Sequence, residues 1–182
     1  MRTRTFRLPA ALTLATVLAG HAALAAPTDL ETSVARMARI GFAGSPVFSP
    51  DGTRIAYLAN LSGSAQVWMV PAAGGYPELV TPFDDPVSNV RWSPDGAWLA
   101  VSVAPGGGLN EQIYLLRPDG RELTRLTDGG KATSQRGAFS HDGKLLAIGS
   151  TREKPDAVTM YLYDVARRQE RRVTAPNGFT GL

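Results

Sequence analysis

Short apolar runs recur along most of this chain, and each is bounded by Gly, Pro, Asp, Asn or Ser. Examples are RIAYLA at 54–59, QVWMV at 66–70 and AWLAVSV at 97–103. Apolar runs of this length, partly alternating with polar residues and bounded by turn residues, are typical of half-buried β-strands. The pattern therefore predicts an all-β chain of many short strands.

The most distinctive landmark is an aromatic residue followed by Ser, a turn residue, Asp and Gly. It occurs as F-S-P-D-G at 48–52, W-S-P-D-G at 92–96 and F-S-H-D-G at 139–143. Pro fixes φ at about −65°, Asp accepts hydrogen bonds from the turn backbone, and Gly takes the positive φ that a hairpin bulge needs. We expect three structural turns, each directing its aromatic residue into the gap between neighbouring sheets. Their residues are Pro50, Asp51, Gly52, Pro94, Asp95, Gly96, His141, Asp142 and Gly143.

The landmarks recur with a nearly constant period. Asp51, Asp95 and Asp142 are 44 and 47 positions apart, and the runs QVWMV, QIYLL and TMYLY follow them in the same order. A period of about 40 to 50 residues indicates a propeller or repeat array, and a sheet with two apolar faces must stack on its neighbours. The sequence thus predicts a partial β-propeller of about three four-stranded antiparallel blades, over about 45–82, 87–128 and 135–175 of a region 45–182.

Three blades are fewer than the roughly four to eight of a closed propeller. We therefore expect the chain to be part of a larger propeller. Two apolar blade faces would be uncovered in the isolated chain, so it should aggregate or dimerise.

The first 25 residues have the organisation of a secretory signal peptide. Three arginines precede an apolar stretch at 8–20, and Ala23 and Ala25 occupy the positions that a signal peptidase reads. The apolar stretch is shorter than the roughly 20 residues of a membrane span, so we expect none. We predict a signal peptide at 1–25, a lead segment at 26–44 that covers an edge of the first repeat, and export to the periplasm or the extracellular space.

Removing the predicted signal changes the charge balance. Three of the 19 basic residues and none of the 16 acidic residues lie in it, so the net charge of +3 belongs to the signal. The remaining chain is neutral, which gives no support for a nucleic-acid partner. The chain has no Cys, so disulfides and thiolate chemistry are excluded.

Candidate catalytic and ligand-binding residues are few. His141 stands where the other copies have Pro, and we interpret it as an exposed turn residue. A single His outside the predicted signal, without Cys, does not make a conventional zinc site, and the turn aspartates lack the spacing of a calcium loop. Glycines 106–108 lie between two predicted strands, without the Lys and helix of a phosphate loop. We expect no catalytic, cofactor-binding or metal-binding residue.

Two arginines remain as candidates for ligand binding. Arg91 and Arg136 lie near the starts of the predicted innermost strands. They are expected to line the central channel, where they meet a substrate carboxylate or, alternatively, pair with a nearby acid.

The S-P-D-G turn before R-I-A-Y or W-L-A, the Q-V-W or Q-I-Y strand and the R-x-L-T closing strand resemble WD40-like propeller repeats of exported bacterial proteins. Such repeats occur in TolB-like proteins and in the propeller domains of the prolyl oligopeptidase family of serine peptidases. TolB-like proteins place an α/β domain ahead of the propeller, for which the short segment after the predicted signal leaves no room. The resemblance therefore favours the peptidase family, including dipeptidyl and acylaminoacyl peptidases, with a TolB-like periplasmic protein-binding propeller as the alternative.

In that peptidase family the propeller covers the mouth of the active site and admits short peptides. The catalytic Ser of a G-x-S-x-G elbow, with its later Asp and His, does not occur in this chain. The resemblance thus implies a gating and docking part that is not hydrolytic alone. Its expected partners are the remaining blades, a C-terminal α/β-hydrolase domain and peptide substrates, without a cofactor.

Overall fold

The computed structural model describes residue 32 and residues 41–175. The predicted signal peptide and nearly all of the lead segment lie outside the described residues. Residues 41–175 lie in the second of two compact units, Gly41–Leu182. In the described residues, no helix is long and apolar enough to cross a membrane.

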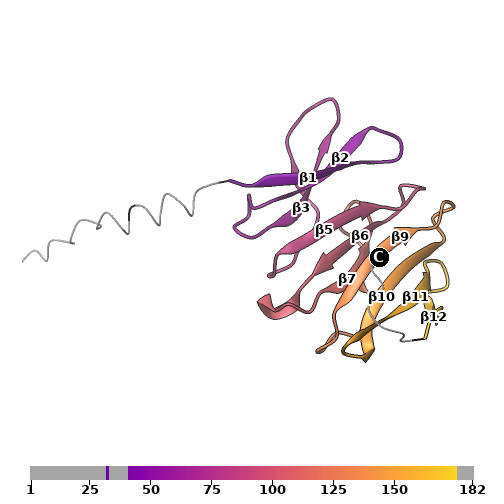
Figure 1. Cartoon of the computed structure of the whole chain (residues 1–182). Helices are drawn as coiled ribbons and strands as arrows, with labels where there is room; N and C mark the ends of the chain where they lie inside the picture. The colour runs from indigo at the N-terminus through magenta and orange to yellow at the C-terminus, as the bar shows by residue number, and fades with distance from the viewer. Residues whose placement is uncertain (1–31, 33–40, 176–182) are drawn as a thin grey trace, which may run out of the picture. The chain divides into compact units, whose positions relative to one another are not determined.

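Three four-stranded antiparallel sheets make up this unit, and in each sheet neighbouring strands follow one another in the chain (Figure 1). The first blade contains β1 (Ala43–Phe48), β2 (Arg54–Ala59), β3 (Gln66–Pro71) and β4 (Glu78–Leu79). The second contains β5 (Val87–Trp92), β6 (Leu99–Val103), β7 (Gln112–Leu116) and β8 (Thr124–Arg125). The third contains β9 (Ser134–Phe139), β10 (Leu145–Lys154), β11 (Ala157–Asp164) and β12 (Gln169–Arg172). The predicted all-β partial propeller is confirmed.

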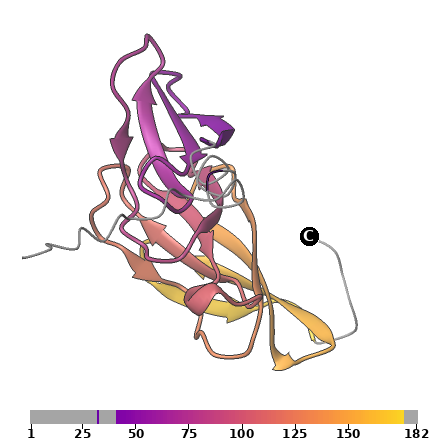
Figure 2. The ribbon, with the colours of Figure 1, turned by 90° about the vertical axis from the view of Figure 1, so that its left-hand side faces the viewer.

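The three blades differ in the loop that joins their second and third strands. In the second blade this loop contains a short 3₁₀ turn, Pro105–Gly107. In the third blade β10 and β11 continue past a register shift between Ser150 and Lys154 and form a longer hairpin. The blades follow one another in chain order (Figure 2).

An apolar core fills each of the two spaces between neighbouring blades. The first core joins Leu58 and Met69 of the first blade to Leu99 and Val101 of the second. The second core joins Ile113 and Leu115 of the second blade to residues of the third. The second blade is thus covered on both sides, and β6 is buried along its whole length. Each fully buried aliphatic side chain contributes about 1.5–3 kcal/mol, so these two cores hold the blades together.

The aromatic residue of the leading turn packs between blades in two of its three copies. Trp92 is only 6% exposed in the first core, and Phe139 packs against the second core. Phe48 is 64% exposed, contrary to the prediction for all three copies. The reason is that no described sheet lies on its side of the first blade.

Candidate functional site

The three leading turns share one hydrogen-bond arrangement. In each, the Ser hydroxyl donates to the Asp carboxylate at 2.5–2.7 Å and accepts the amide that starts the next strand at 2.9 Å. The same carboxylate oxygen accepts the amide two residues further on at 3.0–3.2 Å. The Gly of each turn has φ between 68° and 71°, where Gly is favoured. The residue pattern alone did not predict the role of the Ser. Its hydroxyl connects the turn to the strand that follows.

Hydrogen bonds favour the charged form of two turn carboxylates, Asp51 and Asp142. The hydroxyl of Ser49, followed by the amide and hydroxyl of Thr53, lowers the pKa of Asp51 to about 2. The hydroxyl of Ser140 and the amide of Lys144 lower the pKa of Asp142 in the same way. A carboxylate that stays ionised and is fully engaged in a turn is a poor general acid. These hydrogen bonds lie within the turns, and His141 is exposed in the third of them.

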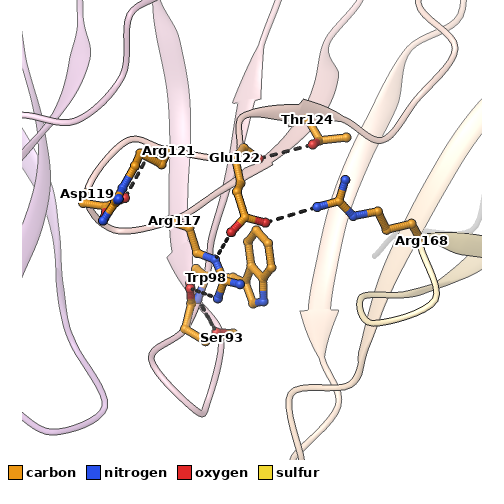
Figure 3. Close-up of polar contacts among 9 residues, drawn as sticks. Ser93, Trp98, Arg117, Asp119, Arg121, Glu122, Thr124 and Arg168 are labelled. Atoms are coloured by element: carbon orange, nitrogen blue, oxygen red, sulfur yellow. Dashed lines mark hydrogen bonds and ion pairs between the residues drawn. The ribbon is translucent and has the colours of Figure 1, made fainter.

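A cluster of charged residues links the second and third blades on the side of the β7–β8 turn (Figure 3). The Arg117 guanidinium lies 3.8 Å from the ring centroid of Trp98, and its Nε bonds to Glu122 at 3.1 Å. The other oxygen of Glu122 binds Arg168 of the third blade at 3.1 Å. Exposed ion pairs of this kind contribute about 0–1 kcal/mol each. Because these charges are paired within the cluster, it is an inter-blade tie rather than a ligand site.

A second inter-blade connection uses buried glutamines. The Gln66 side-chain amide donates to the carbonyls of Phe83 and Asp85 at 2.9 and 3.1 Å, in the linker to the second blade. Its oxygen accepts the Thr81 hydroxyl at 2.8 Å. Gln112 repeats this arrangement with Thr127 at 2.6 Å and with the carbonyl of Ala132 at 2.7 Å. We call each pair, with its linker contacts, a Gln–Thr clamp.

The two arginines predicted to line the channel lie on β5 and β9, the first strands of neighbouring blades. Arg136 is partly buried and donates through one Nη to Asn89 at 2.8 Å and through the other to the Gly137 carbonyl at 2.9 Å. Its Nε is buried and lacks a hydrogen-bond partner among the described residues. Arg91 is exposed, and within the part of the chain that the structure describes neither arginine belongs to an ion pair.

The positive charge of Arg91 acts on the guanidinium group of Arg136. The pKa of Arg136 is lowered first by burial and next by the positive charge of Arg91, while Glu111 opposes this shift. Glu111 itself accepts the Ser88 hydroxyl at 2.6 Å. Two guanidinium groups without a bound carboxylate attract an anion, and an Arg fork fits a carboxylate in bidentate geometry. The arginine pair, Arg91 and Arg136, is therefore the candidate ligand-binding site.

Other kinds of site find no support in the geometry. Over residues 32 and 41–175, no group of three or more His, Cys, Asp or Glu side chains is placed to hold a metal ion. The glycine-rich segment 106–108 is fixed to the preceding linker by a hydrogen bond from the Gly106 amide to Asp85 at 2.8 Å. It serves as a loop between β6 and β7.

Comparison with known proteins matches residues 34–180 to the model of the TolB beta propeller domain family. The uncharacterized peptidase YuxL of Bacillus subtilis (strain 168) is 33% identical over 106 residues, which are 58% of this chain and 15% of that protein. The Tol-Pal system protein TolB of Francisella tularensis subsp. holarctica (strain OSU18) is 29% identical over 91 residues, 50% of this chain and 20% of that protein. The chain thus spans a fifth or less of the length of these two relatives.

Solved structures of TolB and of a peptidase are among those similar to this chain. TolB from Acinetobacter baumannii superposes with a TM-score of 0.57 and 24% identity, covering 76% of this chain and 33% of that one. The acylaminoacyl peptidase of Pyrococcus horikoshii superposes with a TM-score of 0.55 and 14% identity, covering 77% and 26%. Likeness at this level of identity establishes the fold.

Proposed function

We propose, from the premise that the chain belongs to the TolB β-propeller domain family, that it is the substrate-gating and docking part of an exported serine peptidase of the prolyl oligopeptidase family. The similarity to a peptidase over 106 residues supports this assignment. Export through a signal peptide at 1–25, and with it a periplasmic or extracellular location, is part of the proposal.

The observation that carries the proposal is the arginine pair on the innermost strands. Arg91 is exposed, while the buried Nε of Arg136 lacks a partner among the described residues. A peptide with a free C-terminal carboxylate supplies the missing anion, and its charge-assisted hydrogen bonds to Arg are stronger than neutral ones. The pair would thereby hold one end of a short peptide in the channel.

The chemistry of the complete enzyme is acyl transfer from a peptide carbonyl to a serine. This chain contains no G-x-S-x-G elbow, so it contributes selection and positioning and is not hydrolytic alone. The serine, its base and the remaining blades belong to further parts of the enzyme.

The reading frame beyond residue 182 tests the assignment to the peptidase family. A G-x-S-x-G segment followed by Asp and His is expected there. A stop codon after further repeats, without that segment, would contradict the peptidase and favour a TolB-like protein-binding propeller. The similarity to TolB over half of this chain supports that second candidate.

Peptide binding tests the arginine pair itself. A tetrapeptide with a free C-terminal carboxylate should bind the full chain more tightly than the same peptide with a C-terminal amide. Arg91→Gln should lower the affinity for the free-acid peptide about tenfold. Arg91 is exposed and belongs to no ion pair among the described residues, so the variant should keep its structure. Arg121→Gln is the matched control, since Arg121 is exposed and paired with Asp119 outside this site. Equal titration curves for acid and amide in calorimetry would contradict the proposal.

A further inference from the structure

The arginine pair lies between the second and third blades, both of which the structure describes. Arg91 is opposite Ala100 in the sheet, and Ala100 lies in the second core. Asn89, two residues before Arg91, is on the same face of the strand because side chains alternate. Arg136 is opposite Ile148, which lies in the same core on the side of the third blade. The three polar side chains therefore share one gap between two blades.

Asn89 holds Arg136 across this gap. One Nη of Arg136 donates to the side-chain oxygen of Asn89 at 2.8 Å. A guanidinium group has donors only, so the atom of Asn89 that faces it must be the oxygen. The NH2 group of the same amide has no hydrogen-bond partner among the described residues. Asn89 therefore still has a donor to offer to a ligand.

A neutral partner leaves the charge of Arg136 available. The arginines that form ion pairs in the described part of the chain contact a carboxylate at 2.5–3.1 Å. Arg136 is partly buried, has an amide oxygen in place of a carboxylate and lies near the positive charge of Arg91. Burying a charge without a counter-charge costs free energy. A fold that retains such a cost often does so at a functional site.

The backbone beside Arg136 fixes the other end of its side chain. The second Nη donates to the Gly137 carbonyl at 2.9 Å. A Cβ at Gly137 would lie 2.9 Å from the Cβ of Ala147 and 3.1 Å from its carbonyl oxygen, so only Gly fits here. β9 and β10 shift register at this point, and such bulges redirect side chains. Arg136 is thus oriented from its own strand and from Asn89 of the neighbouring blade.

We propose that Asn89 is a specificity-determining residue of the arginine pair. Its oxygen orients Arg136 without neutralising the guanidinium group. Its NH2 group donates to the ligand carboxylate, together with Arg91 and the Nε of Arg136. Because all three groups donate, the site favours an anion over the neutral amide of the same peptide. The inference rests on the proposed function, whose carboxylate-binding site it extends by one residue.

Asn89→Asp tests the need for a neutral partner. The variant keeps an oxygen for Arg136, but it neutralises the guanidinium group and repels a ligand carboxylate. The free-acid tetrapeptide should therefore lose its advantage, with an affinity ratio to the C-terminal amide of about 1 in calorimetry. The melting temperature should not fall, because an ion pair replaces a neutral contact. Asn110→Asp is the matched control, since Asn110 accepts the Thr133 hydroxyl at 3.0 Å and does not bond to Arg136.

Asn89→Ala tests the donor. It removes the NH2 group and the oxygen but leaves Arg136 charged, so the affinity for the free-acid peptide should fall about tenfold. The affinity for the amide should stay the same. Nuclear magnetic resonance of the unmodified chain tests the contact without a substitution. The NH2 resonances of Asn89 should shift when the free-acid peptide is added, and they should not shift with the amide.

The outcomes separate this inference from the proposed function. If the Asn89→Asp chain kept the preference for the free acid, or if saturating free acid left the NH2 resonances of Asn89 in place, the role of Asn89 would be overturned. The arginine pair would then bind the carboxylate alone. Equal affinities of the unmodified chain for acid and amide would instead overturn the proposed function, and this inference with it.

Discussion

The second and third blades have the same strand order and the same leading turn, yet they differ in how they are held. The second blade is covered on both faces, and its Gln112 fixes the linker that leads out of it. Among the described residues the third blade is covered on one face, and Thr159 stands where the others have Gln. The repeat therefore specifies the sheet of each blade, whereas stability also depends on the neighbours.

The third blade retains the Thr of the Gln–Thr clamp but not the Gln. The Thr174 hydroxyl accepts the Met160 amide at 3.0 Å, as Thr127 does for Ile113 at 3.1 Å. Thr159 is fully buried, and its hydroxyl has no partner among the described residues. Its side chain is too short to reproduce the two contacts of a Gln amide, so Thr159 cannot form the clamp of the first two blades.

Truncation of equivalent leucines should give the largest difference between the two blades. Leu115→Ala removes a side chain that is 3% exposed in the second core, and its cost should be about 2–5 kcal/mol. Leu162→Ala, at the same position on the uncovered face, should cost about 1 kcal/mol in the monomer. Urea unfolding of both variants measures the difference. Equal unfolding costs for Leu162→Ala and Leu115→Ala would mean that coverage does not distinguish the two blades.

Removal of the clamp from the second blade should have a smaller effect. Gln112→Ala leaves the Thr127 hydroxyl and the Ala132 carbonyl without their partner, at a cost of about 2–3 kcal/mol. Gln112→Glu keeps an acceptor for Thr127 but loses the donor to the linker, so it separates the two functions of the amide. Hydrogen exchange of the Gly129 amide, which donates to the side-chain oxygen of Gln112 at 3.0 Å, should accelerate in Gln112→Ala but not in Gln112→Glu, which keeps the acceptor. Unchanged protection would show that the linker is held by other contacts.

The clamp also marks the limit of what the sequence predicts. The turns, the period and the four strands per blade follow from local residue patterns, and the proposal that Arg91 and Arg136 bind a ligand also starts from their place on the innermost strands. The glutamines were visible only as the first letter of QVWMV and QIYLL, because their partners are backbone carbonyls up to 20 residues away that have no residue-type signature. The exposure of Phe48 was not predictable either, since it depends on a neighbour outside the motif.

The leading turns should contribute equally to the stability of each blade, whether or not the blade is covered. The reason is that their hydrogen bonds lie within each turn. The pKa of Asp142 in the third blade is lowered by the Ser140 hydroxyl and the Lys144 amide, as that of Asp51 is by its own turn. A carboxyl with a lowered folded-state pKa stabilises the fold above its unfolded pKa of 3.8 and loses this contribution as pH falls towards the folded value, about 2 for Asp51. Melting temperatures between about pH 5 and pH 2 should therefore fall less steeply for Asp142→Asn and Asp51→Asn than for the unmodified chain. Asp128→Asn, at an exposed position, is the control. If the melting temperature became less dependent on pH in only one of the two turn variants, the stabilisation by the turn carboxylate would also depend on blade coverage.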